Sequence, residues 1–114
     1  MRNKLAIASM LAAAIPAAAH HGWSGYDDAK PLTVTGKVIE SRYEQPHGSL
    51  RLRAADRTWL VILAPPSRME TRGLAPADID KGRTVTVVGY AHREKREELR
   101  AERITAGGKT VELR

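Results

Sequence analysis

The residues from Leu32 to Tyr43 form the longest stretch of the chain whose pattern fits only a β-strand. Apolar side chains share one face from Leu32 to Val38 at a spacing of two, and the apolar face then passes to Ile39 and Tyr43. The alternation therefore slips by one residue close to Gly36, which is typical of a β-bulge or a bend. A long first strand that bends at its middle can serve two parts of a sheet, which is how small β-barrels turn their corners.

Shorter strand-like stretches follow this one and are separated by turn residues. The apolar stretch that ends before Ala64 is followed by Pro66 at a helix-start position and by Gly73 at a helix end. Two adjacent glycines near the end of the chain indicate a tight hairpin. The predicted strands are 32–43, 49–53, 58–63, 84–90 and 98–105, with helical segments at 67–72 and 76–80 and a final hairpin strand at 109–113.

The order of three strands, a helix and two strands resembles the oligonucleotide/oligosaccharide-binding (OB) fold, a five-stranded, partly open Greek-key barrel. The resemblance covers residues 32–105, and its sequence support is the element order together with the pattern from Gly82 to Gly89. It implies a mainly β protein, a small OB-like Greek-key barrel with a short helix between its third and fourth strands. The competing architecture is an open antiparallel sheet with a helix across one face.

The first 19 residues have the three parts of a secretory signal peptide. Met1–Lys4 is basic, Leu5–Ile15 is apolar, and Pro16–Ala19 combines a helix breaker with small residues. The apolar run is shorter than the about 20 residues that a membrane-spanning helix needs, and no later stretch offers a second candidate. We expect cleavage after Ala19 and export to the periplasm, with a mature chain that begins at His20.

The mature chain would then hold an irregular arm at residues 20–31 and one barrel domain at residues 32–114. Two of the 19 basic residues lie in the signal peptide, so 17 basic residues would face 13 acidic ones. Basic and acidic residues are interleaved, as in Arg93–Glu98, and this pattern argues against a nucleic-acid partner. The chain contains no cysteine, which excludes disulfides and thiol chemistry.

Several segments also resemble an uncharacterised family of small exported proteins from Gram-negative bacteria, classed as a domain of unknown function. The chain departs from the family pattern at Gln45, where relatives carry an asparagine, and at Gly22–Trp23. The resemblance implies export and a fold, and it carries no established activity. The matching segments are His20–His21, Glu44–His47, Leu63–Ser67, Val87–Tyr90 and Leu99–Ile104.

The four histidines are the residues that could bind a metal. A mature chain starting at His20 offers its α-amine and its imidazole to one metal ion, a chelate that suits Cu(II), and one more imidazole would complete a T-shaped site. His47 and His92 lie in the predicted loops between strands one and two and between strands four and five, which line the ligand-binding mouth of an OB fold. We expect the arm to enter the first strand near the far end of the barrel and to fold back over it.

A cut one residue earlier would give a different site of the same metal class. The terminal amine, two deprotonated amides and the imidazole of His21 would then form a square-planar Cu(II) or Ni(II) site. The plain alternative is that these histidines are ordinary tail and loop residues. The candidate metal ligands are therefore His20, His21, His47 and His92.

A second hypothesis is a binding module without a metal, whose barrel mouth takes a small anionic ligand or an acidic region of a periplasmic protein. Such binding would weaken with ionic strength. Trp23 would either cover the ligand or anchor the arm, and amphipathic aromatic residues favour anchoring. The basic residues assigned to this mouth are Arg42, Arg51, Arg53 and Arg93.

A third hypothesis, an enzyme, lacks a complete catalytic constellation. The stretch Gly22–Gly25 is one residue short of a nucleophile elbow, and no His–Asp pair is tied to it. No nucleophile, base and oxyanion donor occur together at a recognisable spacing. A redox enzyme built on a copper site would fit the histidines best, but the sequence predicts a non-enzymatic binding module.

Overall fold

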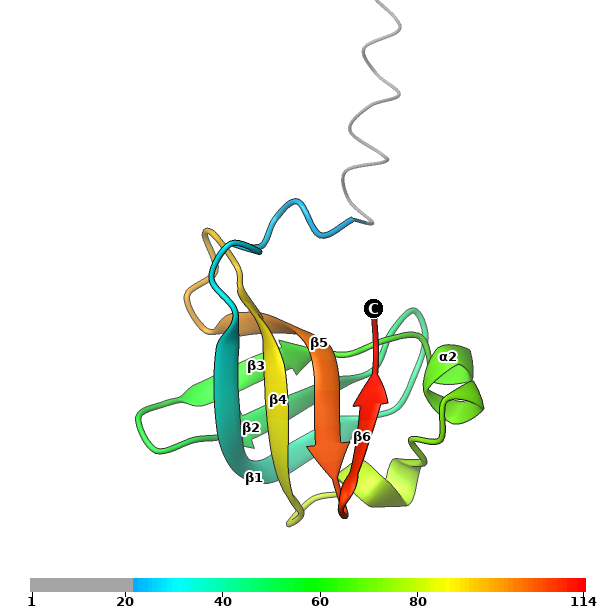
Figure 1. Cartoon of the computed structure of the whole chain (residues 1–114). Helices are drawn as coiled ribbons and strands as arrows, with labels where there is room; N and C mark the ends of the chain where they lie inside the picture. The colour runs from blue at the N-terminus through cyan, green and yellow to red at the C-terminus, as the bar shows by residue number, and fades with distance from the viewer. Residues whose placement is uncertain (1–21) are drawn as a thin grey trace, which may run out of the picture.

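The computed structural model of the protein describes residues 22–114, and Figure 1 shows them as a β-barrel with a short helix at one side. The elements follow the order predicted from the sequence. They are β1 (Leu32–Arg42), β2 (Ser49–Arg53), β3 (Thr58–Ile62), α2 (Pro66–Thr71), the 3₁₀-helix η2 (Pro76–Ile79), β4 (Thr84–Ala91), β5 (Glu98–Ala106) and β6 (Lys109–Glu112). None of the helices within residues 22–114 has the length and apolar character that a membrane crossing requires.

The bend predicted in the first strand is present in β1. Its first half, Leu32–Lys37, pairs with β4, and its second half, Lys37–Arg42, pairs with β2. The register of the β1–β2 pair shifts between Val38 and Glu40, which marks the bulge. A single strand can therefore connect the two sides of the barrel.

The barrel closes through a parallel pairing between β3 and β5. Leu60, Val61 and Ile62 lie opposite Glu98, Leu99 and Arg100, while all other strand pairs are antiparallel. The closed order is β1-β2-β3-β5-β4, and β6 adds to β5 through the predicted glycine hairpin. This closure confirms the OB-like barrel and rules out the open sheet.

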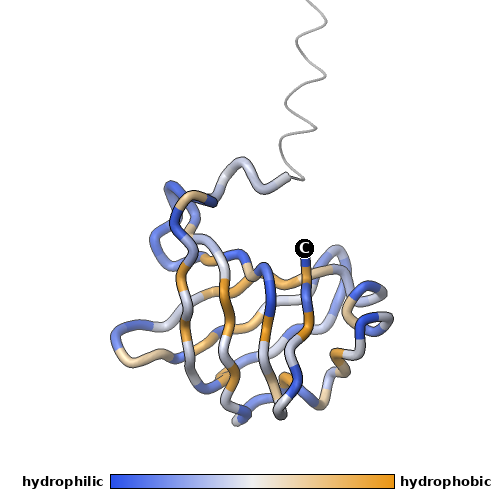
Figure 2. The backbone as a smooth tube through the Cα atoms, in the orientation of Figure 1, coloured by the Kyte–Doolittle hydropathy of each residue, from blue (hydrophilic) through white to orange (hydrophobic). Residues whose placement is uncertain are grey.

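Alternating residues of the strands fill the barrel interior. Figure 2 shows the apolar stretches along the strands and the hydrophilic ones in the loops. Trp59 is 6% exposed, as its place in an apolar strand predicts, and Met69 of α2 packs into the same core. The side chains with no exposed surface are Val38, Leu52, Val61, Met69, Leu74, Ile79, Val87, Leu99, Ala101 and Ile104.

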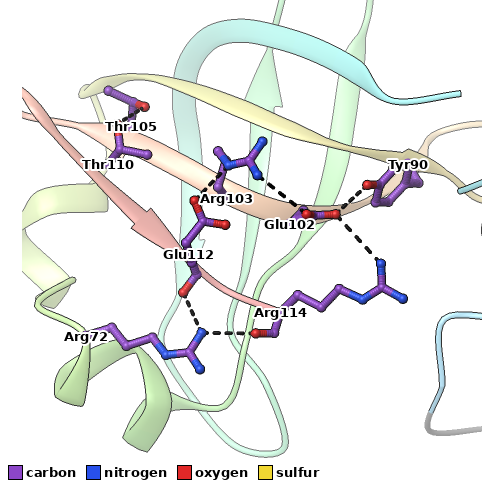
Figure 3. Close-up of polar contacts among 8 residues, drawn as sticks. All are labelled: Arg72, Tyr90, Glu102, Arg103, Thr105, Thr110, Glu112 and Arg114. Carbon is purple, nitrogen blue, oxygen red and sulfur yellow. Dashed lines mark hydrogen bonds and ion pairs between the residues drawn. The ribbon is translucent and has the colours of Figure 1, made fainter.

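Polar contacts hold α2 against the last strand. Arg72 donates hydrogen bonds to the carbonyl oxygens of Glu112 (2.8 Å) and Arg114 (3.1 Å), as Figure 3 shows. Arg72 follows the last residue of α2, and Arg68 within the helix donates to the carbonyl oxygen of Leu113 at 3.0 Å. The helix therefore satisfies backbone acceptors along the unpaired edge of β6 and at the residues that follow it.

Gly89 lies where β4 and β5 approach most closely. A Cβ atom at this position would lie 2.1 Å from the carbonyl oxygen of Arg100 and 2.9 Å from the Cα atom of Ala101. The β4–β5 register shifts between Val88 and Gly89, so this glycine is part of a second bulge. Only a residue without a side chain allows the two backbones to pass at this distance.

We expect Gly89→Ala to destabilise the barrel by about 3 kcal/mol, because the added methyl group must push two backbones apart. Urea unfolding followed by circular dichroism measures this change. Val88→Ala is the control, because it alters the neighbouring residue without a backbone clash. Equal stability of Gly89→Ala and the unsubstituted protein would contradict the close approach of β4 and β5.

Candidate functional site

A cavity of about 500 Å³ lies where the β1–β2 loop, the β4–β5 loop and the arm meet. Its volume is in the range of small-ligand sites. Two of the four predicted histidines line it, one from each loop, as the OB-like fold predicts. Polar side chains on its wall are those of Tyr26, His47, His92, Lys95, Glu98 and Arg100.

The arm reaches this cavity directly. The amide of Asp27 donates to the carbonyl oxygen of Ala91 at 2.9 Å, and the amide of Arg93 donates to that of Gly25 at 2.8 Å. Figure 1 shows the arm, in blue, beside the loop that joins β4 and β5. The prediction that the arm enters at the far end was wrong, because the antiparallel pairing of β1 with β4 places the start of one beside the end of the other.

The ring of His92 is held by its own loop. Its Nδ1 atom accepts hydrogen bonds from the amides of Glu94 (3.1 Å) and Lys95 (3.0 Å). Because Nδ1 accepts, the proton of the neutral ring sits on Nε2, which faces Gly25. A metal needs an unprotonated ring nitrogen. These contacts therefore make His92 a residue that orders its loop rather than a metal ligand.

The hydrogen bonding of His47 differs from that of His92. The segment that follows it is fixed, since Gly48 exchanges backbone hydrogen bonds with Leu63 (2.8 Å) and Ala64 (2.9 Å). The Nδ1 atom of His47 is buried, and no residue of the described chain bonds to it. His47 therefore lines the cavity, and its Nδ1 atom, unlike that of His92, is not used by its own loop.

Arg100 enters the cavity from β5, between the core residues Leu99 and Ala101. Its guanidinium carbon lies 4.5 Å from the ring centre of Trp23, and its Nη1 donates to the carbonyl oxygen of Gly22 at 3.3 Å. Burial lowers the pKa of this guanidinium, which still carries its charge at neutral pH. A half-buried cation thus faces the space between the two loops.

Tyr26 and Glu98 form a bonded pair on the cavity wall. The Tyr26 hydroxyl donates to a carboxylate oxygen of Glu98, and its ring meets that of His92 edge to face at 5.0 Å. Burial, and then the bond to the Glu98 carboxylate, raise the pKa of Tyr26 well above its usual range. This pair ties the arm to the first residue of β5.

Trp23 packs against the barrel as an anchor of the arm. Its ring centre lies 5.9 Å from that of Tyr90 and 4.4 Å from the guanidinium carbon of Arg114. Together with the contact to Arg100, these interactions place two cations within cation–π distance of one indole. The aromatic residue therefore stabilises the arm and orients Arg100.

The four arginines predicted to line the mouth do not converge there. Arg42 and Arg51 contact Glu40 in a separate hollow of about 110 Å³ on the outer face of β1 and β2. Arg53 pairs with Thr58 beside the β2–β3 turn. Arg93 adjoins the arm, with its Nε atom 3.4 Å from the carbonyl oxygen of Ser24.

Some residues of the cavity wall were not predicted from the sequence, and two predicted metal ligands are not among the residues that the structure describes. His20 and His21 lie outside the described residues. Within residues 22–114, no three His, Asp or Glu side chains form a metal-binding group. The missed residues are Lys95, Glu98 and Arg100, and the available signal was the charged residue that alternates with the core residues of β5.

The Tyr26–Glu98 pair predicts a loss of stability at alkaline pH. The pKa of Tyr26 is raised in the folded state, so above about pH 10 the unfolded chain loses a proton that the folded chain retains, and unfolding becomes more favourable. We expect the free energy of unfolding to fall less steeply in Tyr26→Phe than in the unsubstituted protein, as measured by urea unfolding from neutral to alkaline pH. Identical slopes would contradict the assignment.

One solved structure supports the fold, and a second is reported beside it. A chain of the S. pombe Stn1–Ten1 complex matches with a TM-score of 0.53 and 14% identity, covering 67% of this chain and 57% of that one. A chain of a complex of TiaS with transfer RNA and ATP matches with a TM-score of 0.49 and 18% identity, covering 75% of this chain and 19% of that one. At these identities the likeness concerns the fold alone, and the present chain spans less than two thirds of the length of either match.

Comparison with curated proteins gives no match. A family model does match, and it covers residues 7–100, which is most of the chain. The protein therefore belongs to the family of unknown function DUF6152.

Proposed function

We propose that the protein is a small exported binding module that holds one Cu(II) ion at the cavity between its two loops and its arm. The observation that carries the proposal is that His47 and Gly22 line the same cavity. Two residues of polypeptide reach at most about 7 Å, so an N-terminus at residue 20 stays within reach of that cavity. Its amine and imidazole, with the imidazole of His47, make the T-shaped nitrogen set that suits Cu(II).

The two loop histidines have different roles in this proposal. His47 is the ligand from the barrel, because no neighbour in residues 22–114 fixes its Nδ1 atom. His92 orders the β4–β5 loop and the arm, because its Nδ1 atom already accepts two backbone hydrogen bonds. The metal is therefore bound by the chain terminus and one loop, and the second loop supports the arm.

Export and metal binding would be linked by chemistry. The α-amine of His20 exists as a free ligand only after a signal peptide has been removed, since before cleavage that nitrogen belongs to a peptide bond. A precursor still carrying residues 1–19 would lack the chelate. Copper binding would thus begin in the periplasm, where the mature chain is released.

The decisive variant adds the tripeptide Gly-Pro-Gly ahead of His20 in the mature protein. A single added glycine would place His21 third from the terminus and create the square-planar site, whereas this extension puts no histidine at the third position and its proline has no amide proton to lose. The variant keeps every side chain but moves the α-amine away from the His20 imidazole, so we expect Cu(II) affinity to fall at least about tenfold. His47→Ala should cause a loss of similar size. Isothermal titration calorimetry gives the affinity, and the electron paramagnetic resonance spectrum of bound Cu(II) reports the nitrogen ligands.

His92→Gln is the matched control, because the glutamine oxygen can still accept hydrogen bonds from the loop amides while an imidazole is lost. We expect its Cu(II) affinity to match that of the unsubstituted protein. Equal affinity in the Gly-Pro-Gly-extended protein and the mature protein would reject the terminal chelate. A larger loss in His92→Gln than in His47→Ala would reverse the assigned roles.

A further inference from the structure

Two buried side-chain nitrogen atoms in residues 22–114 have no hydrogen-bond partner, and they are His47 Nδ1 and Arg100 Nε. Folded proteins provide a hydrogen-bond partner for nearly every buried polar atom, so each exception needs a physical explanation. Both residues line the one cavity of about 500 Å³ between the loops and the arm. Because both atoms are buried, a ligand in the cavity would contact other nitrogen atoms of these two side chains.

The charge of the cavity wall gives the class of that ligand. Arg100 forms no ion pair within the described part of the chain, although it is partly shielded from water. The nearest wall carboxylate, that of Glu98, accepts the hydroxyl hydrogen of Tyr26 instead. Lys95 adds a second cation at the exposed rim. A shielded guanidinium without a counterion is unfavourable, and an anionic ligand would supply the missing charge.

We infer that this cavity binds a small organic anion through its carboxylate or phosphate group, with Arg100 as the main anchor. The planar guanidinium presents paired N–H donors that match both groups. Lys95 contributes charge at the rim. The cavity is larger than one such group, so the rest of the ligand lies between the loops, against Ile62 and the arm.

This site differs from the mouth predicted from the sequence, since Arg42, Arg51 and Arg53 lie elsewhere. Nor does it depend on bound copper, because its anchor is a cation that comes from β5. A ligand at Arg100 would also contact the arm, whose Trp23 and Gly22 already hold this side chain.

The test uses the metal-free mature protein, freed of chelator, in two-dimensional ¹⁵N nuclear magnetic resonance titrations. Inorganic phosphate and malonate are added separately, with sodium chloride at equal ionic strength as the reference. We expect saturable shifts of the Arg100 Nε–H signal and of the amides of residues 22–26 and 92–95, but not with chloride. Saturation by phosphate alone would assign a phosphate group, and saturation by malonate alone a carboxylate.

Arg100→Gln should weaken this binding at least about tenfold, because it removes a charged hydrogen-bond donor pair. Arg103→Gln, on the same strand and paired with Glu112 outside the cavity, should leave it unchanged. Lys95→Gln should weaken it several-fold, and this exposed position keeps the test decisive if Arg100→Gln fails to fold. Binding that survives Arg100→Gln or Lys95→Gln intact, or that falls equally in Arg103→Gln, would overturn the inference.

The proposals of an anion site and of a copper site can be rejected independently of each other. The Gly-Pro-Gly extension ahead of His20 should leave anion binding unchanged, because no charged group of the cavity wall moves. Shifts spread evenly over the basic surface, without saturation, would reduce the anion effect to general electrostatic screening and reject the site.

Discussion

The parallel pairing of β3 with β5 is the contact on which the barrel depends. Every other strand pair joins neighbours in the antiparallel sheet, and without this one both edges of the sheet would stay open. The chain has no cysteine, so no disulfide replaces it. The same pairing sets Ile62 opposite Arg100, and it therefore positions the wall of the cavity as well as the closure of the barrel.

Backbone contacts, more than side chains, decide which histidine can act. His47 and His92 face one cavity, but the turn after β4 uses the Nδ1 atom of His92 as an acceptor for two amides. The β1–β2 loop makes its backbone bonds through Gly48 and leaves the His47 ring uncommitted. The two histidines thus differ in chemistry, because one loop uses a ring nitrogen as a hydrogen-bond acceptor and the other does not.

The fold could be predicted from the sequence because its signals are local. Strict alternation defines β2, a proline and a glycine frame α2, and a slip in apolar spacing locates the bulge of β1. The two loop histidines could be assigned to one mouth because the OB-like order fixes which loops meet.

The site was harder to predict, because its residues are brought together by strand pairings between distant parts of the sequence. Arg100 is one of several outward arginines in the sequence, and only the β3–β5 register places it at the cavity. The course of the arm depends on its bonds to Ala91 and Arg93, which have no sequence signal.

The cation–π contacts of Trp23 also connect the two ends of the described chain. Arg100 reaches the indole from β5 and Arg114 reaches it from the residues after β6, whose backbone is in turn held by Arg72 at the end of α2. Release of the arm therefore removes contacts from the last residues, and fraying of those residues loosens the arm. We therefore expect the two segments to form one unit of local unfolding, with hydrogen-exchange rates that rise and fall together although they are far apart in sequence.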